Sequence, residues 1–274
     1  MPPKPKGVAK RQRRTKNVFK TSRQLHIQNT LTPAATAVDD KTRPIFFWKP
    51  HEFSTGYLSQ WYAQPFRGRN TPIIITSLST DITIPNNNSD IIYPTAEHFM
   101  MHQKAVLFGD SAMALEILSA KSPRQVKALG RKVQNFDPVV WEAAREIIVV
   151  EGNWCKFSLP VVSPDQEPEN LEEREGGERI WQLGNDPDAE QYKGKSFREV
   201  LLATGDRELV EASPMDRIWG VGFGAQNAPA NREKWGLNLL GKCLMEVREQ
   251  FRREDEEARK KGEMEIDNGE GEAL

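Results

Sequence analysis

The sequence predicts a single α+β domain that is predominantly helical. Short β-branched and aromatic runs lie before residue 90, whereas after it apolar residues recur with the spacing of helices. The 274 residues include 38% hydrophobic residues, which is enough to form a core. The 18 prolines and 19 glycines indicate long irregular stretches beside that core.

The few strands are expected first. The folded part begins at the aromatic run Ile45–Trp48, and Phe53–Trp61 is interpreted as a strand or an ordered loop. Residues Thr71–Thr76 are short and β-branched, which predicts a strand. The Asn-rich stretch 85–90 is expected to form a turn.

Six helices are expected after these strands, and several have clear start signals. Pro94 suits a first helical turn, Asp110 can cap the next helix, and Ser122-Pro123 with Gln125 forms a capping pattern. Asp137 precedes Pro138 at the start of a fourth helix. The expected spans are about 94–108, 110–120, 123–130, 137–152, 197–203 and 237–253.

The first 43 residues are expected to form a disordered basic tail. Residues 1–24 contain nine Lys or Arg and no acid, so the other 250 residues sum to −10 within a total of −1. The run Lys10–Arg14 is typical of a nuclear localisation signal or a nucleic-acid patch. The interpretations, in order, are nuclear targeting through an import receptor, a solvated tail without a specific role, and a mitochondrial presequence.

Two acidic segments are expected to lie outside the core. Residues 161–194 hold ten acids against three bases and predict a solvated insertion, and residues 254–274 hold nine against three and predict a disordered tail. The folded domain is therefore expected over 44–253, with 161–194 inserted in it.

Several classes of protein are excluded. No apolar run reaches the roughly 18 residues that span a bilayer, and the N-terminus has no apolar segment typical of a secretory signal. Cys155 and Cys243 are too few for a disulfide framework or a Cys-rich zinc site, so an intracellular protein, cytoplasmic or nuclear, is expected. His98 and His102 could share a metal on a helix face, but no third ligand is evident, and no metal is expected.

Three places carry residues suited to chemistry. Glu97 and Lys104 are seven residues apart, so they share one face of the expected helix and could flank a charged substrate. The ordinary interpretations are a helix-dipole glutamate and a solvated lysine. Trp141 lies in a first helical turn, and Asp216 and Trp219 share a Gly-containing loop. A tryptophan usually belongs to the core, but beside carboxylates its ring can also stack on a base.

Seven short motifs follow one another along the chain. In order, they are Phe53-Ser54-Thr55-Gly56-Tyr57-Leu58-Ser59; Tyr93-Pro94-Thr95-Ala96-Glu97-His98 with Lys104; Ala128-Leu129-Gly130-Arg131; Trp141 with Lys156-Phe157; Leu201-Leu202-Ala203-Thr204-Gly205-Asp206 with Leu209-Val210-Glu211; Asp216-Arg217-Ile218-Trp219-Gly220; and Gly236-Leu237-Asn238-Leu239-Leu240-Gly241 with Leu244-Met245-Glu246-Val247-Arg248. As a set they resemble the NADAR family, also called YbiA-like, over roughly 46–251 without the insertion. Gln60-Trp61 departs from the usual Asn-Phe, and Phe136-Asp137-Pro138 stands where a basic residue often precedes the tryptophan.

The resemblance implies an N-glycosidase with no metal and no organic cofactor. It implies that Glu97 stabilises a ribosyl cation or orients water, and that Asp216 protonates the leaving nitrogen or fixes the ribose hydroxyls. Trp141 and Trp219 would stack on the ring or close the pocket to water. Lys104 would neutralise a 5′-phosphate or form an imine, and Arg131 would pair with phosphate.

Three functions remain open at this point. The first is hydrolysis of a ribosylamino-pyrimidine phosphate, an intermediate of the riboflavin pathway. The second is the same chemistry on ADP-ribose attached to a base or a protein. The third is a non-enzymatic nucleotide-binding module. The expected partner is a small ribosylated, nucleotide-like molecule, and the basic tail could add a nuclear import receptor or nucleic acid.

Overall fold

The computed structural model describes residues 42–76, 81–85, 90–161 and 196–269. All of them belong to one compact unit, Val38–Leu274. The basic tail up to residue 41, the 86–89 part of the expected turn and residues 162–194 of the acidic insertion lie outside the described residues.

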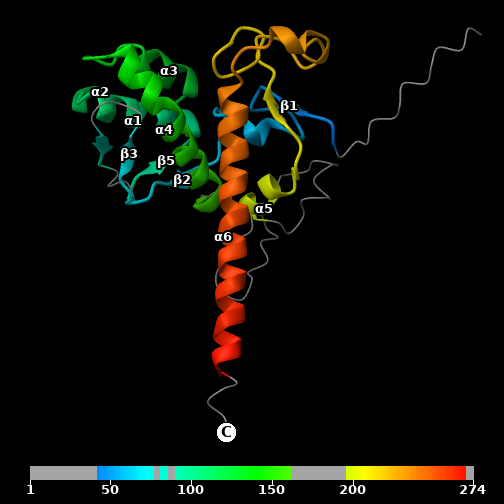
Figure 1. Cartoon of the computed structure of the whole chain (residues 1–274). Coiled ribbons are helices and arrows are strands. Elements are labelled where there is room, and N and C mark those ends of the chain that lie inside the picture. Colours follow the sequence, from blue (N-terminus) through cyan, green and yellow to red (C-terminus); the bar gives the residue numbers. More distant parts are fainter. Residues whose placement is uncertain (1–41, 77–80, 86–89, 162–195, 270–274) are drawn as a thin grey trace, which may run out of the picture. The chain divides into compact units, whose positions relative to one another are not determined.

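The strands are short and pair two by two (Figure 1). β1 (Ile45–Phe47) runs parallel to β6 (Leu209–Glu211), with Phe47 opposite Glu211. The two antiparallel pairs join β2 (Phe66–Arg67) to β5 (Ile92–Tyr93) and β3 (Ile73–Ile75) to β4 (Ile82–Ile84). The sequence predicted β3, inside Thr71–Thr76, and the start of the folded part at Ile45, but it did not predict β1 or the other strands. Phe53–Trp61 is an ordered loop with a 3-10 turn, η2 (Gly56–Leu58).

Each of the six helices begins within two residues of its predicted start. They are α1 (Ala96–Leu107), α2 (Ser111–Ser119), α3 (Pro123–Gly130), α4 (Pro138–Ser158), α5 (Phe197–Leu202) and α6 (Leu239–Gly269). Asp110, Ser122 and Asp137 cap α2, α3 and α4 as expected. Thr95 caps α1, so Pro94 precedes the helix instead of opening it.

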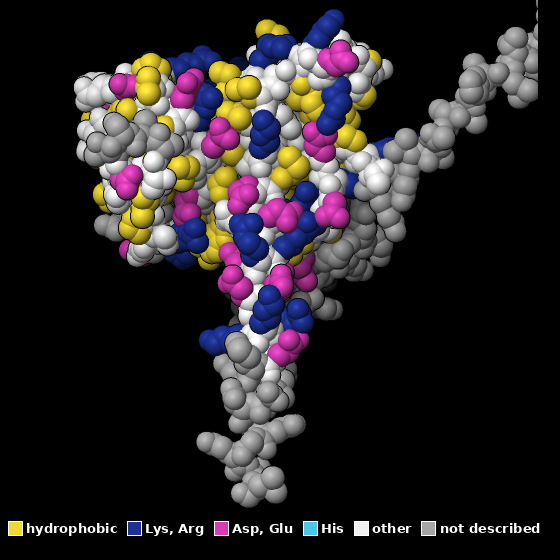
Figure 2. All heavy atoms as spheres, viewed as in Figure 1, with side chains coloured by type: hydrophobic (Ala, Val, Ile, Leu, Met, Phe, Trp, Pro, Cys, Tyr) yellow, Lys and Arg dark blue, Asp and Glu magenta, His cyan; other side chains and the backbone are white. Residues whose placement is uncertain are grey.

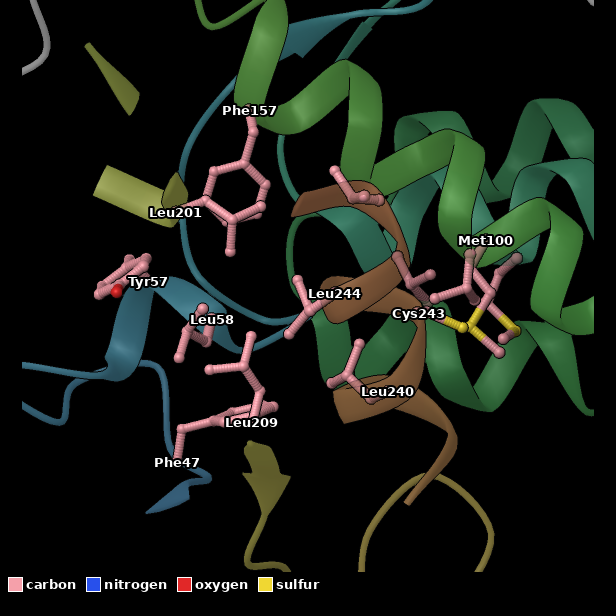
Figure 3. Packing of buried hydrophobic residues seen from close by; sticks show 14 of the residues in the cluster. Phe47, Tyr57, Leu58, Met100, Phe157, Leu201, Leu209, Leu240, Cys243 and Leu244 are labelled. Carbon is pink, nitrogen blue, oxygen red and sulfur yellow. The ribbon is translucent and has the colours of Figure 1, made fainter. Parts of the chain in front are cut away.

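The core forms around the N-terminal half of α6. Figure 1 shows α6 between helices α1–α4 on one side and β1 with α5 on the other. Leu240, Cys243, Leu244, Val247 and Phe251 are all buried, which confirms the apolar face read from the sequence. Figure 3 shows side chains from α1, α4, α5 and both parallel strands converging on this face.

The predicted end of α6 near Arg253 is wrong, because the helix continues to Gly269. The expected acidic tail is therefore helical for most of its length. Intrahelical ion pairs Glu256–Lys260 and Arg259–Glu263 support this extension, since opposite charges four residues apart meet on a helix surface. Figure 2 shows both signs of charge interspersed along it. In the part of the chain that the structure describes, no helix has the length and apolar character to cross a bilayer.

A buried lysine on α4 fixes the loop that follows η2. The Lys156 side chain is fully buried, and its Nζ donates to the carbonyls of Tyr57 at 2.6 Å and Ser59 at 3.0 Å. Burial lowers the pKa of Lys156 to about 7. The two carbonyls lie just before Gln60 and Trp61, so this contact sets where those residues lie.

Replacing Lys156 by Met should lower the free energy of unfolding by roughly 1–3 kcal/mol, because two shielded carbonyls lose their donor. Urea unfolding followed by circular dichroism measures the change. The exposed Lys132→Met serves as the matched control and should stay within about 0.5 kcal/mol of wild type. Equal stabilities of the two variants would contradict this role of Lys156.

Candidate active site

Glu97 lies in the first turn of α1, where two contacts fix it. Thr95 caps the helix through the His98 amide, and the Glu97 amide donates to the Gln60 carbonyl at 3.1 Å. The Glu97 side chain is buried, with 6% of its surface exposed. A glutamate at this position is thus held between the helix and the η2 loop and is not a solvated helix-dipole residue.

The loop side of this site is formed by Trp61, whose side chain hydrogen-bonds to the Glu97 carboxylate. The Trp61 ring also lies 6.0 Å from Lys127 Nζ on α3. The Gln60 side chain is buried beside it and accepts from Asn153 at 3.4 Å. The departure Gln60-Trp61 noted in the sequence therefore falls at the site itself.

The pKa of Glu97 is raised to about 7. Burial is the main cause, because it disfavours the charged carboxylate, and the Asp216 carboxylate raises the pKa further. Lys127, the Trp61 hydrogen bond and Arg131 act in the opposite direction. A carboxyl group with this pKa exchanges protons close to neutral pH, as a general base requires.

A tight loop after β6 supplies the second acidic group. Asp216 Oδ1 accepts from the Ile218 amide at 2.9 Å and the Trp219 amide at 2.8 Å, so it holds the turn that carries Trp219. At Gly220, a Cβ would lie 2.7 Å from the Glu211 carbonyl. Only a glycine lets the loop fold back this closely onto the strand end. Asp216 raises the pKa of both Glu97 and Glu211, so its carboxylate lies within electrostatic range of both groups.

Helix α3 adds positive charge to this acidic cluster. Between Glu116 and Asp137 the chain holds five cations and no acid. Lys127 and Arg131 lower the pKa of Glu97. Their spacing places them, together with Arg124, on one face of the helix. Among the ion pairs formed by described residues, none involves a cation of this stretch.

Lys104 and Trp141 lie together at the far end of α3. Lys104 Nζ donates to the Gly130 carbonyl at 2.8 Å and lies 5.2 Å from the Trp141 ring and 4.3 Å from the Phe136 ring. Burial lowers the pKa of Lys104. Arg131 follows Gly130 directly, so α3 links this pair to the carboxyl cluster.

The two α1 histidines are structural. His98 contacts Thr95 Oγ1 at 2.8 Å and the Ala120 carbonyl at 3.0 Å, which occupies both ring nitrogens. His102 lies 3.0 Å from the Tyr93 hydroxyl, and burial lowers its pKa to about 4. Within the four described ranges, no three His, Cys, Asp or Glu side chains are grouped to hold a metal ion.

The structure thus joins Glu97, Asp216 and Arg131 in one region, with Trp219 on the Asp216 turn and Lys104 beside Trp141. Sequence reasoning noted Trp61 only as a departure from the family pattern and missed Lys127 and Glu211. Glu211 ends a quoted motif, but a lone glutamate after a strand carries no signal of its own. The acid-free run around α3 was the signal that could have indicated Lys127.

Residues 46–252 match the NADAR domain, which is most of the chain. The chain belongs to the NADAR family. This confirms the resemblance inferred from the seven motifs. The match spans the loop with Trp61, the start of α1, helix α3 and the Asp216 turn, so all parts of the site lie inside the NADAR domain.

Curated relatives of this NADAR protein include enzymes. It is 38% identical over 162 residues to "N-glycosidase R617" of Acanthamoeba polyphaga mimivirus, covering 58% of this chain and 74% of the relative. It is 32% identical over 163 residues to "N-glycosidase Npun_R5314" of Nostoc punctiforme, covering 60% and 77%. It is 28% identical over 179 residues to "Riboflavin biosynthesis protein PYRR, chloroplastic" of Zea mays, covering 62% and 22%.

The buried state of Glu97 predicts a pH-dependent effect of Glu97→Gln on stability. Because the folded-state pKa of Glu97 is about 7 and its ordinary value is 4.5, the folded protein retains this proton between those pH values and the unfolded chain does not. The contribution of Glu97 to stability therefore falls as pH rises through this window. Relative to wild type, the Gln variant should gain on the order of 2–3 kcal/mol between pH 4.5 and 8.

Urea unfolding at pH 4.5, 6 and 8 measures this difference. Glu142→Gln is the control, since Glu142 is an exposed glutamate on α4. Parallel pH dependence of wild type and Glu97→Gln would show that Glu97 is not buried in its neutral form.

Proposed function

We propose that the protein hydrolyses the ribose–nitrogen bond of a ribosylamino-pyrimidine phosphate. The enzyme class, a hydrolase of N-glycosyl bonds, follows from membership of the NADAR family and from the relatives named N-glycosidase. The riboflavin-related name of the maize protein supports a pyrimidine intermediate of that pathway as the substrate.

The observation that carries the proposal is the buried carboxyl group of Glu97. Cleavage of an N-riboside passes through a cationic ribosyl transition state, which a carboxylate stabilises strongly where water is excluded. With a pKa of about 7, Glu97 is also able to accept the proton of the attacking water. The Trp61 hydrogen bond orients the carboxylate for both tasks.

Asp216 and the two tryptophans are proposed to bind the substrate. Asp216 Oδ1 is occupied by two backbone amides, which leaves Oδ2 to accept from ribose hydroxyls. This geometry favours the hydroxyl-binding role over proton donation. Trp219 and Trp141 are both partly buried at the edge of the core, so each keeps part of its ring surface available for stacking.

The phosphate is proposed to bind at the basic face of α3. Lys127 and Arg131 lower the pKa of Glu97, but neither forms an ion pair with an acidic side chain among the described residues. Both cations are therefore available to an anion. Lys104 donates to the carbonyl of Gly130, the residue before Arg131, so it would have to leave this carbonyl before it could bind phosphate or react as an amine.

One observation favours ADP-ribose conjugates as an alternative substrate. Arg124, Lys127 and Arg131 extend over two turns of α3, about 10 Å, which exceeds the reach of a single phosphate. A diphosphate would contact more of this face. Product analysis separates the two, because one substrate class releases ribose 5-phosphate and the other ADP-ribose.

Glu97→Gln should lower kcat for the ribosylamino-pyrimidine phosphate about 100- to 1000-fold, which corresponds to roughly 3–4 kcal/mol of lost transition-state stabilisation. Release of ribose 5-phosphate, followed by mass spectrometry, measures it. Glu142→Gln should keep wild-type turnover. Normal turnover in Glu97→Gln would remove Glu97 from the mechanism.

Lys127→Met should raise KM about 10- to 100-fold, because a charge-assisted bond to phosphate is lost. Lys121→Met removes the same charge from an exposed position that does not act on Glu97, and its KM should stay close to that of wild type. Steady-state kinetics at constant ionic strength compares the two. Equal effects would mean that only the net charge of α3 matters.

A further inference from the structure

Glu211 is a carboxyl group in this site to which no role has yet been given. It ends β6, opposite Phe47 in the β1 pairing. Its amide donates to Asn238 Oδ1 at 2.9 Å, and its carbonyl accepts from the Val221 amide at 2.9 Å. The backbone of Glu211 is therefore held by three separate segments.

The side chain of Glu211 has an unused oxygen. Its Oε2 is shielded from solvent and has no hydrogen-bond partner in the described part of the chain. A shielded polar atom without a partner is costly in a folded protein, so its presence calls for an explanation. This oxygen is available to a substrate.

Three charged or titratable groups act electrostatically on Glu211. They are Asp216 from the loop after β6, Lys127 from α3 and Glu97 from α1. Burial and the two neighbouring carboxylates raise the pKa of Glu211 to about 8, while Lys127 lowers it. With a pKa raised to about 8, Glu211 is largely protonated at neutral pH, as a proton donor requires. Two neighbouring carboxyl groups with different proton affinities are the usual arrangement of an acid and a base.

We infer that Glu211 is the general acid that protonates the leaving nitrogen, with Glu97 as its partner base. This inference rests on the proposed function. The C1′–N bond breaks and its electron pair goes to nitrogen, which takes the Glu211 proton. A water oxygen bonds to C1′, and the water proton passes to Glu97. The net change is addition of one water across the C1′–N bond, and proton exchange with solvent restores both carboxyl groups.

The first test compares pH profiles of kcat/KM for the ribosylamino-pyrimidine phosphate. Wild type should lose activity below about pH 7, where Glu97 is protonated, and above about pH 8, where Glu211 is ionised. Glu211→Gln should lower the maximum of kcat/KM about 100-fold or more, and its kcat/KM should no longer fall at high pH. Glu211→Asp, which restores a carboxyl group, should regain part of the activity and the fall at high pH.

The second test uses a leaving group that needs no acid. A ribosyl pyridinium 5′-phosphate leaves as a neutral pyridine, because its ring nitrogen already carries the positive charge. Glu211→Gln should cleave it at a rate within about threefold of wild type, while Glu97→Gln should fail on both substrates. Glu208→Gln is the matched control, since this carboxylate lies on the same segment but forms a surface pair with Arg232.

The outcomes separate the two claims. Full activity of Glu97→Gln would contradict the proposed function, whatever the result for the Glu211 variants. A fall of kcat/KM at high pH that persists in Glu211→Gln, or a loss equal for both leaving groups, would overturn the inference alone. If wild type does not accept the pyridinium compound, the pH profiles decide. Thermal unfolding of each variant confirms that it is folded, and Glu211→Met, which also lacks a carboxyl group, replaces Glu211→Gln if the latter is not.

Discussion

The site depends on the close approach of the start of α6 to strand β6. Gly241 lies against the Leu209 carbonyl, where a Cβ would collide with the backbone. Asn238, with a positive φ of 52°, donates to that carbonyl at 2.9 Å and accepts from the Glu211 amide at 2.9 Å. This contact joins the central helix to the strand that carries Glu211 and to the loop that carries Asp216.

This arrangement buries acidic groups, which lowers the stability of the folded protein. Glu97 and Glu211 lie close to Asp216 where water is largely excluded, so their charged forms are disfavoured. Lys127 offsets part of the repulsion. The exclusion of water destabilises the folded protein, but it also raises the pKa values of these two carboxyl groups to near neutral pH. Acid–base catalysis requires such pKa values.

Long-range contacts rather than local ones hold the loop that completes the site. Lys156 on α4 reaches back to carbonyls of residues 57 and 59, and the Gln60 carbonyl accepts from Glu97. The loop has little regular structure, and its place is set by these bonds to two helices. An ordered loop beside a rigid scaffold can change sequence, as Gln60-Trp61 does, without changing the fold.

The sequence by itself determined the helix starts and the buried face of α6, because caps and periodicity are local signals. It also placed Glu97, Asp216 and Arg131 in the motifs of one family, because those motifs are short and contiguous. It could not determine the pairing of β1 with β6, since strands of two or three residues carry too little pattern. It also missed Glu211, Lys127 and Trp61 as neighbours of Glu97. Their proximity arises only when α1, α3, the η2 loop and β6 pack together, and electrostatic coupling through a shielded interior follows distance in space and not distance along the chain.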